Sequence, residues 1–471
     1  MAMPFLSYTR GVLAHIKTTH KYNLSTVRAQ PLLELSGALG DLGTFVPIFV
    51  ALVSSNQVSA PATLVFSGIA NILTGILFGI PLPVQPMKAI AAVAIQKGLS
   101  NAEIAGAGFF VAGAVGLLSL AGLLNWFTRV VPVPIVKGIQ VGAGLSLMLS
   151  AFTNNFAPLL RFGPHVEREA AIMVSTLLLL LFCSLRPGRP FVFIIVIVSI
   201  LMQFVHFGIL GSDLSIPRSV IELWQPKVVV PTGSEFLDGL LTAGLGQLPL
   251  TTLNSVLAVM VLAQDLFPTL NWQDKLPSAS EIGSSVAMMN LVGLWFQAMP
   301  FCHGSGGLAA QYRFGARSGA SVIMLGTLKL VLGLCMADWV TLWCQEFSKV
   351  GTAMLGVLVF LAGLELAKMG HNVNGKGAQD LWINAAESAQ EEPESAHEPS
   401  THSPREPKLR ELSDEDGMRR WTIMMVTVGA LLGAKNDGIG FAAGLIVHWA
   451  YIGQDWYRTR HEGHIRLESH D

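Results

Sequence analysis

Charged residues are scarce in this chain. Only 13% of its 471 residues are Asp, Glu, Lys or Arg, and 51% are hydrophobic. An ordinary soluble domain carries about 25% charged residues, and a fold with far fewer could not cover its own surface in water. Lipid solvates an apolar exterior, and a net charge of −1 offers no basic surface for nucleic acid. The composition predicts an integral protein of the lipid bilayer with no nucleic-acid partner.

Cysteines and clustered metal ligands are also few. The four cysteines lie in or near apolar runs, with no pair spaced as metal ligands, and are expected to be small buried side chains: Cys183, Cys302, Cys335 and Cys344. A polytopic membrane enzyme would be expected to show clustered Asp and His ligands or a nucleophile motif, and the sequence has neither. We therefore predict no metal, no cofactor and no catalytic residue.

Apolar segments recur along most of the chain, and most approach the ~20 residues needed to cross the hydrocarbon core. They lie near residues 32–53, 60–80, 103–124, 132–152, 168–185, 190–208, 240–264, 281–299, 318–337, 348–368, 421–435 and 438–452. Residues 1–31 are polar and basic and show no cleavable signal peptide. The pattern predicts an all-α, multi-pass membrane fold.

Two further segments, 86–97 and 303–314, are too short and too polar to span alone. Each begins just after a proline-containing break, at Pro81 to Pro86 and at Pro300. Proline removes a backbone donor and pushes the preceding residue into extended geometry. We therefore predict two half-helices, each preceded by a short strand, which brings the total to about fourteen membrane elements.

The two halves of the chain resemble each other. The LGDL of residues 39–42 parallels the LGQL of residues 245–248, and the glycine, phenylalanine and proline at 75, 78 and 83 recur at 293, 296 and 300. An odd number of elements in each copy would turn the second copy upside down, as in many secondary transporters. We predict two inverted seven-element repeats, 32–210 and 240–452, joined by an extracytoplasmic connector at 211–239.

Loop charge predicts the orientation. With residues 1–31 in the cytoplasm, most basic residues of the short loops face inward, as the positive-inside rule requires: Arg129, Arg186, Arg189, Arg313 and Arg317. Segment 371–420 is polar and rich in Glu, Ser and Pro, and we expect a disordered cytoplasmic loop. Residues 453–471 are expected to form a cytoplasmic tail.

The starts of the two half-helices predict an anion site. The first turn of a helix has unpaired N–H donors and about half a positive charge, so two such N-termini meeting at the midplane would bind an anion. Glycines there let the anion approach the backbone. The predicted substrate-binding residues are Gln85, Pro86, Met87, Lys88, Cys302, His303, Gly304, Ser305, Gly306, Thr44, Gln247 and Thr251.

Two of these residues have an alternative interpretation. A lysine in the first helical turn opposes the helix dipole and is costly in lipid, and a bound anion would offset both penalties at Lys88. Lys88 could instead pair with a buried carboxylate for structure alone. His303 could donate to an oxyanion or carry a proton, and it could equally be a plain helix cap.

The first apolar segment has a polar face. Glu34, Gly37, Asp41 and Thr44 follow helical spacing, and buried carboxylates in lipid are functional by default. Asp41, Glu34 and His303 are therefore the candidates for a coupling proton or cation. The corresponding segment of the second half has Gln247, Thr251 and Asn254 on one face, with a kink expected at Pro249. We expect Lys329 and Glu365 to anchor helices or to pair structurally.

Three segments carry a family resemblance. Residues 40–47 (GDLGTFVP), 83–92 (PVQPMKAIAA) and 302–317 (CHGSGGLAAQYRFGAR) resemble the molybdate transporters of plants, algae and fungi, a branch of the sulfate-permease superfamily. The resemblance covers about 32–452. It implies a core and a gate domain, an oxyanion held between the third and tenth elements, and elevator-like movement. The C-terminal regulatory domain typical of sulfate permeases is expected to be absent.

The resulting prediction is a proton-coupled secondary transporter of molybdate. Sulfate or another oxyanion is the alternative cargo, and a passive anion channel the alternative mechanism. A nucleobase permease would be expected to place a carboxylate near the second half-helix, and residues 299–312 contain none. The sequence leaves open whether the membrane is the plasma membrane, the vacuole or another endomembrane, and whether the chain forms a homodimer.

Overall fold

The computed structural model describes residues 3–157, 174, 223–271, 276–345, 360, 363–364, 367–375, 379–383, 408–409 and 412–468. The predicted spans 168–185 and 190–208 and most of 348–368 lie outside these residues. The chain forms two compact units, and each is described by itself. The first unit comprises Met1–Arg129 and Ala143–Leu366, and the second comprises Val130–Gly142 and Ala367–Asp471.

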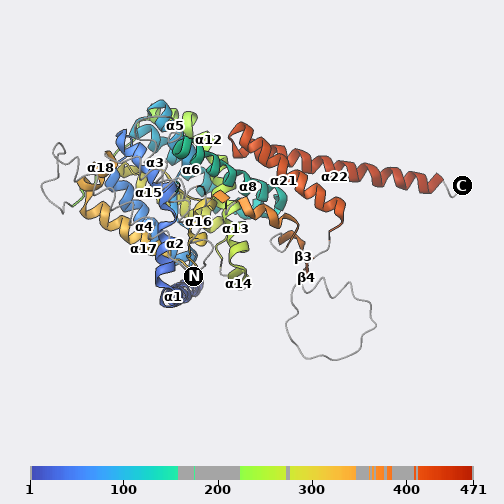
Figure 1. Ribbon diagram of the computed structural model, residues 1–471, viewed down its shortest axis with the longest axis horizontal. Helices are drawn as coiled ribbons and strands as arrows, with labels where there is room; N and C mark the ends of the chain where they lie inside the picture. Colours follow the sequence, from blue (N-terminus) through green and yellow to red (C-terminus); the bar gives the residue numbers. More distant parts are fainter. Residues whose placement is uncertain are drawn as a thin grey trace, which may run out of the picture. The chain divides into compact units, whose positions relative to one another are not determined.

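Helices dominate the described residues, and several could cross a membrane (Figure 1). Four are long and apolar enough: α4 (Ala60–Phe78), α6 (Asn101–Leu120), the stretch Val133–Thr153 that contains α8 (Val133–Ser150), and the long helix Gly233–Leu266. A bent pair at Pro31–Ser54 would make a fifth, and the shorter α17 (Ala320–Cys335) is also apolar. The predicted all-α membrane fold is confirmed, whereas the count of fourteen elements is not tested.

The first predicted span, 32–53, is not one straight helix. It follows α1 (Met3–Ala29) and consists of α2 (Pro31–Leu39) and α3 (Leu42–Ser54), separated by a two-residue turn. The axis also bends by 44° at residue 47. Gly40 in the turn favours helix poorly, and proline at position 47 has no N–H to donate to the preceding turn.

The corresponding helix of the second half is continuous but irregular. It runs through α11 (Gly233–Gly239), η3 (Leu240–Gly244), α12 (Leu245–Leu250), η4 (Thr251–Ala258) and α13 (Val259–Leu266). Pro249 lies inside α12, and the π-helical turns of η4 begin two residues later. Because proline breaks the hydrogen-bond ladder, the kink expected at Pro249 takes the form of this change in helix type.

Both half-helices form as predicted. Strand β1 (Val84–Pro86) leads into α5 (Lys88–Lys97), and strand β2 (Phe301–His303) leads into α16 (Ser305–Arg313). The two strands pair with each other in antiparallel register. The proline-containing breaks at 81–86 and 300 therefore determine where the backbone changes from helix to strand.

The remaining helices pack in a reciprocal pattern. Helix α4, which precedes β1, packs on α17, which follows α16; α15 (Ala279–Gly293), which precedes β2, packs on α6, which follows α5. Glycines allow the close approach of α4 to α17: a Cβ on Gly68 would lie 2.7 Å from the carbonyl oxygen of Gly326. This reciprocity is what two copies of one structural plan would produce.

Shorter helices complete the unit: α7 (Leu123–Val130), η1 (Ala151–Phe156), α14 (Pro268–Asn271), η5 (Leu294–Phe296) and α18 (Ala337–Gln345).

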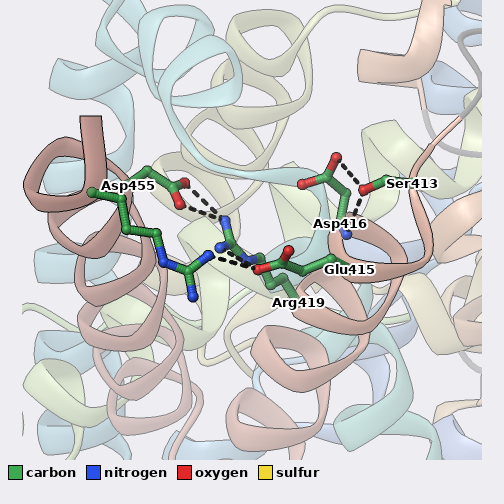
Figure 2. Close-up of polar contacts among 6 residues, drawn as sticks. Ser413, Glu415, Asp416, Arg419 and Asp455 are labelled. Carbon is green, nitrogen blue, oxygen red and sulfur yellow. Dashed lines mark hydrogen bonds and ion pairs between the residues drawn. The ribbon is translucent and has the colours of Figure 1, made fainter. Parts of the chain in front are cut away.

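The second unit is built around α21 (Asp414–Ala434) and α22 (Asp437–Glu468). Figure 2 shows the guanidinium of Arg419 between the carboxylates of Asp455 on α22 and Glu415 on its own helix, at 2.8 and 2.7 Å. Ser413 caps the start of α21 by accepting a hydrogen bond from the backbone N–H of Asp416. This network joins the two helices at the end where α21 begins, and α22 continues well into the tail predicted at 453–471.

Part of the predicted disordered loop 371–420 has regular structure. It contains most of η6 (Lys368–Asn374), as well as η7 (Gln379–Leu381) and the paired strands β3 (Trp382–Ile383) and β4 (Lys408–Leu409), and α21 begins before its end. Arg420 of α21 holds the first part of this segment in place. Its guanidinium donates to the carbonyl of Val373 at 2.9 Å and forms an ion pair with Asp380. The expectation of disorder is therefore corrected at both ends of the loop, and residues 384–407 lie outside the described part.

Candidate functional site

The paired strands bring the starts of the two half-helices together. Val84 faces His303, Gln85 faces Cys302 and Pro86 faces Phe301. The N–H of Met87, at the start of α5, donates to the carbonyl of Pro300 at 2.9 Å. A ladder of three residue pairs spans only roughly 7 Å, so the two helix N-termini lie on either side of one small region. This region is the candidate site predicted from the sequence.

Two buried asparagines hold the strands from outside. Asn71 of α4 accepts a hydrogen bond from the N–H of Val84 at 2.8 Å. Asn290 of α15 accepts one from the N–H of Phe301 at 2.7 Å and donates to the carbonyl of the same residue at 2.6 Å. Both asparagines are fully buried. Sequence analysis missed them, although each lies in the helix before its strand, and this matching position was the available signal.

Asp41, Thr44 and Gln85 form one hydrogen-bonded group. The side-chain amide of Gln85 donates to Asp41 Oδ1 and to Thr44 Oγ1, the latter at 2.7 Å. Thr44 also donates to Asp41 Oδ1 at 3.0 Å. No described donor contacts Asp41 Oδ2, and the residue is fully buried. The structure therefore joins the carboxylate of the first span to the strand of the first half-helix.

Lys329 is a buried cation that acts on this carboxylate. Lys88 also interacts electrostatically with Asp41. The ammonium of Lys329 lies 3.7 Å from the ring centre of Phe45, the side chain is 3% exposed, and Nζ has no described hydrogen-bond acceptor. Lys329 was expected to anchor a helix or to pair structurally. Its position beside the first span was not predicted, because α17 and α2 are far apart in the sequence and contact only in the fold.

Gln247 caps the start of α5. Its side-chain oxygen accepts hydrogen bonds from the N–H groups of Ala89 at 2.9 Å and Ile90 at 3.4 Å. Its side-chain amide donates to Thr251 Oγ1 at 3.0 Å. Gln247 was predicted as a substrate ligand, and the structure places its carbonyl oxygen where a helix N-terminus would bind an anion oxygen.

The start of α16 is similarly polar. The hydroxyl of Ser305 donates to Asn254 Oδ1 on η4, and both residues are buried. A Cβ on Gly307 would lie 2.5 Å from the amide nitrogen of Gln85, and a Cβ on Gly304 would overlap its amide oxygen. These glycines therefore let the Gln85 side chain lie directly against the first turn of α16.

The other predicted ligands surround the strand ladder. Cys302 is 6% exposed, and its thiol donates to the carbonyl of Pro86 at 3.8 Å. Met87 is 1% exposed and precedes the first residue of α5. A Cβ on Gly306 would meet the side chain of Leu147 at 2.8 Å. All of them lie at or beside the starts of the half-helices.

His303 faces away from the helix starts. Its Nδ1 donates to the carbonyl of Pro83 at 3.3 Å, so the neutral ring accepts at Nε2 from Ser285 Oγ, 3.0 Å away. The ring also packs edge-on against Phe78. Both nitrogens have protein partners, and neither bonds to the first turn of α16, which begins after Gly304 without a side-chain cap, so His303 does not act as a helix cap here.

Glu34 lies at a different place from Asp41. Its Oε1 accepts hydrogen bonds from the backbone N–H of Arg317 and from Ser318 Oγ, both at 3.1 Å. These partners belong to the loop between α16 and α17. The turn at residues 40–41 separates the two carboxylates that a straight helix would have placed on one face.

The described residues hold no group of three or more His, Cys, Asp or Glu side chains that could bind a metal ion. What the candidate site can do is bind an anion, because it combines two helix N-termini, amide and hydroxyl donors and two lysines with a single carboxylate.

Comparison with known proteins agrees with this geometry. Residues 33–147 and 239–366 match the profile of a family described as molybdate transporter of the MFS superfamily. The chain is 34% identical over 395 residues to molybdate transporter 1 of Arabidopsis thaliana, covering 76% of this chain and 84% of that protein. It is 36% identical to molybdate transporter 2 of the same plant, covering 74% and 81%.

A solved structure shares the fold. Murine Slc26a9, an anion transporter in the inward-facing state, superposes with a TM-score of 0.54 at 12% sequence identity. The match covers 95% of this chain and 72% of that one.

Proposed function

The chain belongs to the molybdate transporter family, and from that premise we propose that it is a secondary active transporter that carries molybdate across a membrane. The family membership predicted from segments 40–47, 83–92 and 302–317 is confirmed. It is an integral multi-pass membrane protein of a transporter family, which is not a family of enzymes. The substrate, the coupling ion and the movement are the parts that we infer.

The charge of the site is the observation that carries the substrate proposal. With Asp41 ionised and Lys88 and Lys329 protonated, the side chains leave one net positive charge. The two half-helix N-termini add about half a charge each, so the site carries about two positive charges. Molybdate is a dianion at neutral pH, so its charge matches that of the site.

Asp41 is the proposed proton carrier. Its Oδ1 accepts from Gln85 and Thr44, which leaves Oδ2 to take a proton without breaking either bond. Protonation removes one negative charge from the site and so favours a bound dianion. In return, the bound dianion favours the protonated form, which couples the two ligands. Glu34 and His303 are weaker candidates because their described hydrogen bonds go to groups outside the cluster around Asp41.

Proton symport has an energetic reason. Moving a charge against the membrane potential costs about 2.3 kcal/mol per 100 mV, so a dianion entering a negative interior costs about twice that. Two protons carried with each molybdate would cancel the charge movement. In the proposed cycle, the helices around β1 and β2 move together with the anion, elevator-like, and both chain termini lie in the cytoplasm.

Uptake into reconstituted vesicles tests the proposal. Purified protein in liposomes should accumulate molybdate above its external concentration when the outside is acidic, and a protonophore should abolish the accumulation. Equilibration without accumulation would indicate a passive channel. Stronger uptake of sulfate than of molybdate in the same vesicles would support the alternative cargo and reject molybdate as the physiological substrate.

A further inference from the structure

Helix α1 precedes the first membrane segment and docks on the end of α4. The ring of His15 donates from Nε2 to the carbonyl of Leu77 at 2.8 Å. The side-chain amide of Asn23 donates to the carbonyl of Gly75 at 2.9 Å. Two contacts about two turns apart on α1 reach the last turn of α4, so α1 crosses the end of α4 instead of running along it.

The same face of α1 also contacts the loop between α16 and α17. The hydroxyl of Tyr22 donates to the carbonyl of Arg317 at 2.9 Å. The hydroxyl of Thr26 lies 2.5 Å from that of Ser318. One face of α1 therefore packs against the rest of the protein.

The opposite face of α1 is basic. Lys17, Lys21, Leu24 and Arg28 follow the spacing i, i+4, i+7 and i+11, which places them on one side of the helix. All four are exposed, whereas Asn23, on the docked side, is buried. The helix contains no Asp or Glu from Met3 to Ala29, so nothing on α1 itself neutralises this face.

The contacts of α1 place this helix at the level of the bilayer surface. Helix α1 ends at Ala29 and α2 begins at Pro31, the first residue of the bent span. At its other contact, α1 bonds to Leu77, which is 40% exposed and continues the outward apolar row of Ile69 and Leu73 on α4. In a membrane protein such a row faces lipid, so α1 lies beside the lipid at both contacts.

We propose that α1 is an interfacial helix whose basic face binds the headgroups of anionic phospholipids. Lysine and arginine on such a helix extend their charged ends to the headgroup level, while Leu24 between them can enter the boundary of the acyl region. With the N-terminus in the cytoplasm, α1 meets the leaflet that carries the negative surface potential. Lipid binding there would hold α1 against the end of α4 and the loop after α16, which lead to and from the half-helices.

The test uses the full-length protein in neutral detergent micelles titrated with phosphatidylserine. Hydrogen exchange of the amides in residues 14–30 reports the lipid contact. The double variant Lys17→Gln/Lys21→Gln is compared with Lys97→Gln/Lys227→Gln, which removes the same charge at exposed positions away from α1. Each basic residue near an anionic surface contributes about a factor of five in binding, so the α1 variant should need about 30-fold more phosphatidylserine for half-maximal protection.

Three results would overturn the proposal. Phosphatidylserine could fail to protect residues 14–30 in the unmodified protein. The two double variants could shift the titration equally, which would indicate a general charge effect. Soluble polyglutamate could protect the same amides as well as the lipid does, which would indicate an acidic protein as the partner. None of these measurements depends on the identity of the transported anion.

Discussion

Replacing Asn290 with leucine tests how the candidate site is held in place. Leucine removes both hydrogen bonds to Phe301, whose backbone N–H and carbonyl are buried beside a side chain that is 1% exposed. A buried backbone group left without a partner costs about 1–3 kcal/mol, so Asn290→Leu should destabilise the protein by about 2–6 kcal/mol. Strand β2 should also shift, which would weaken substrate binding at the start of α16.

Asn71→Leu is the matched control in the other half. Asn71 holds Val84 through one bond, and its own side-chain nitrogen is buried without a described acceptor. Leucine there leaves one backbone N–H unpaired but also removes an unpaired amide, so the loss should be below about 3 kcal/mol. The two variants should therefore differ in stability for two reasons. Asn290→Leu breaks one additional hydrogen bond at Phe301, and only Asn71→Leu removes a buried amide nitrogen that has no acceptor.

Thermal unfolding in detergent and the KM for molybdate uptake would measure both effects. Asn290→Leu should unfold at the lower temperature and have the higher KM, with Asn71→Leu between it and the unmodified protein. Equal unfolding temperatures for the two leucine variants, or a larger loss at Asn71, would show that these bonds do not set the position of the strands.

Three further changes probe the site itself. Lys88→Ala should raise the KM for molybdate at least about 30-fold, because a charge facing a buried dianion is lost; an unchanged KM would remove Lys88 from the site. Lys329→Met should lower the temperature of thermal unfolding, because buried Asp41 loses an electrostatic partner, and adding Asp41→Asn should recover most of the loss, since the buried charge is then gone. Gly304→Ala should raise the KM for molybdate, because its Cβ would displace the amide end of Gln85 from Asp41 and Thr44, whereas Gly246→Ala, with open space around it, should transport normally.

Local chemistry made the two half-helices predictable. Proline restricts its own backbone and that of the residue before it, whatever the tertiary surroundings. Consequently the breaks before residues 86 and 303 could be found from the sequence, as could the glycines and donors beside them. The pairing of the two strands was not predicted, and its physical reason is that two extended segments in lipid must satisfy their backbone groups with each other.

Contacts between distant segments were harder to predict. Lys329 and Asp41 lie almost three hundred residues apart, and neither local pattern indicates the other. The same holds for Asn290 and its strand, where a buried amide in an apolar helix looks like many others. For Glu34 the error was a wrongly expected proximity instead of a missed contact. Helical spacing predicted that Glu34 and Asp41 share one face, and the turn at Gly40 separates them.

Composition and the positions of proline and glycine were enough to predict a membrane protein, the places where its helices break, and broken ends that are polar and suited to an anion. These properties depend on composition and on the covalent geometry of proline and glycine, which act within a few residues. The three-dimensional packing was needed to show that Lys329 lies over Phe45, that His303 contacts Ser285, and that Gln247 caps α5. Those outcomes depend on how helices from the two halves pack, and a distance along the chain carries no information about such packing.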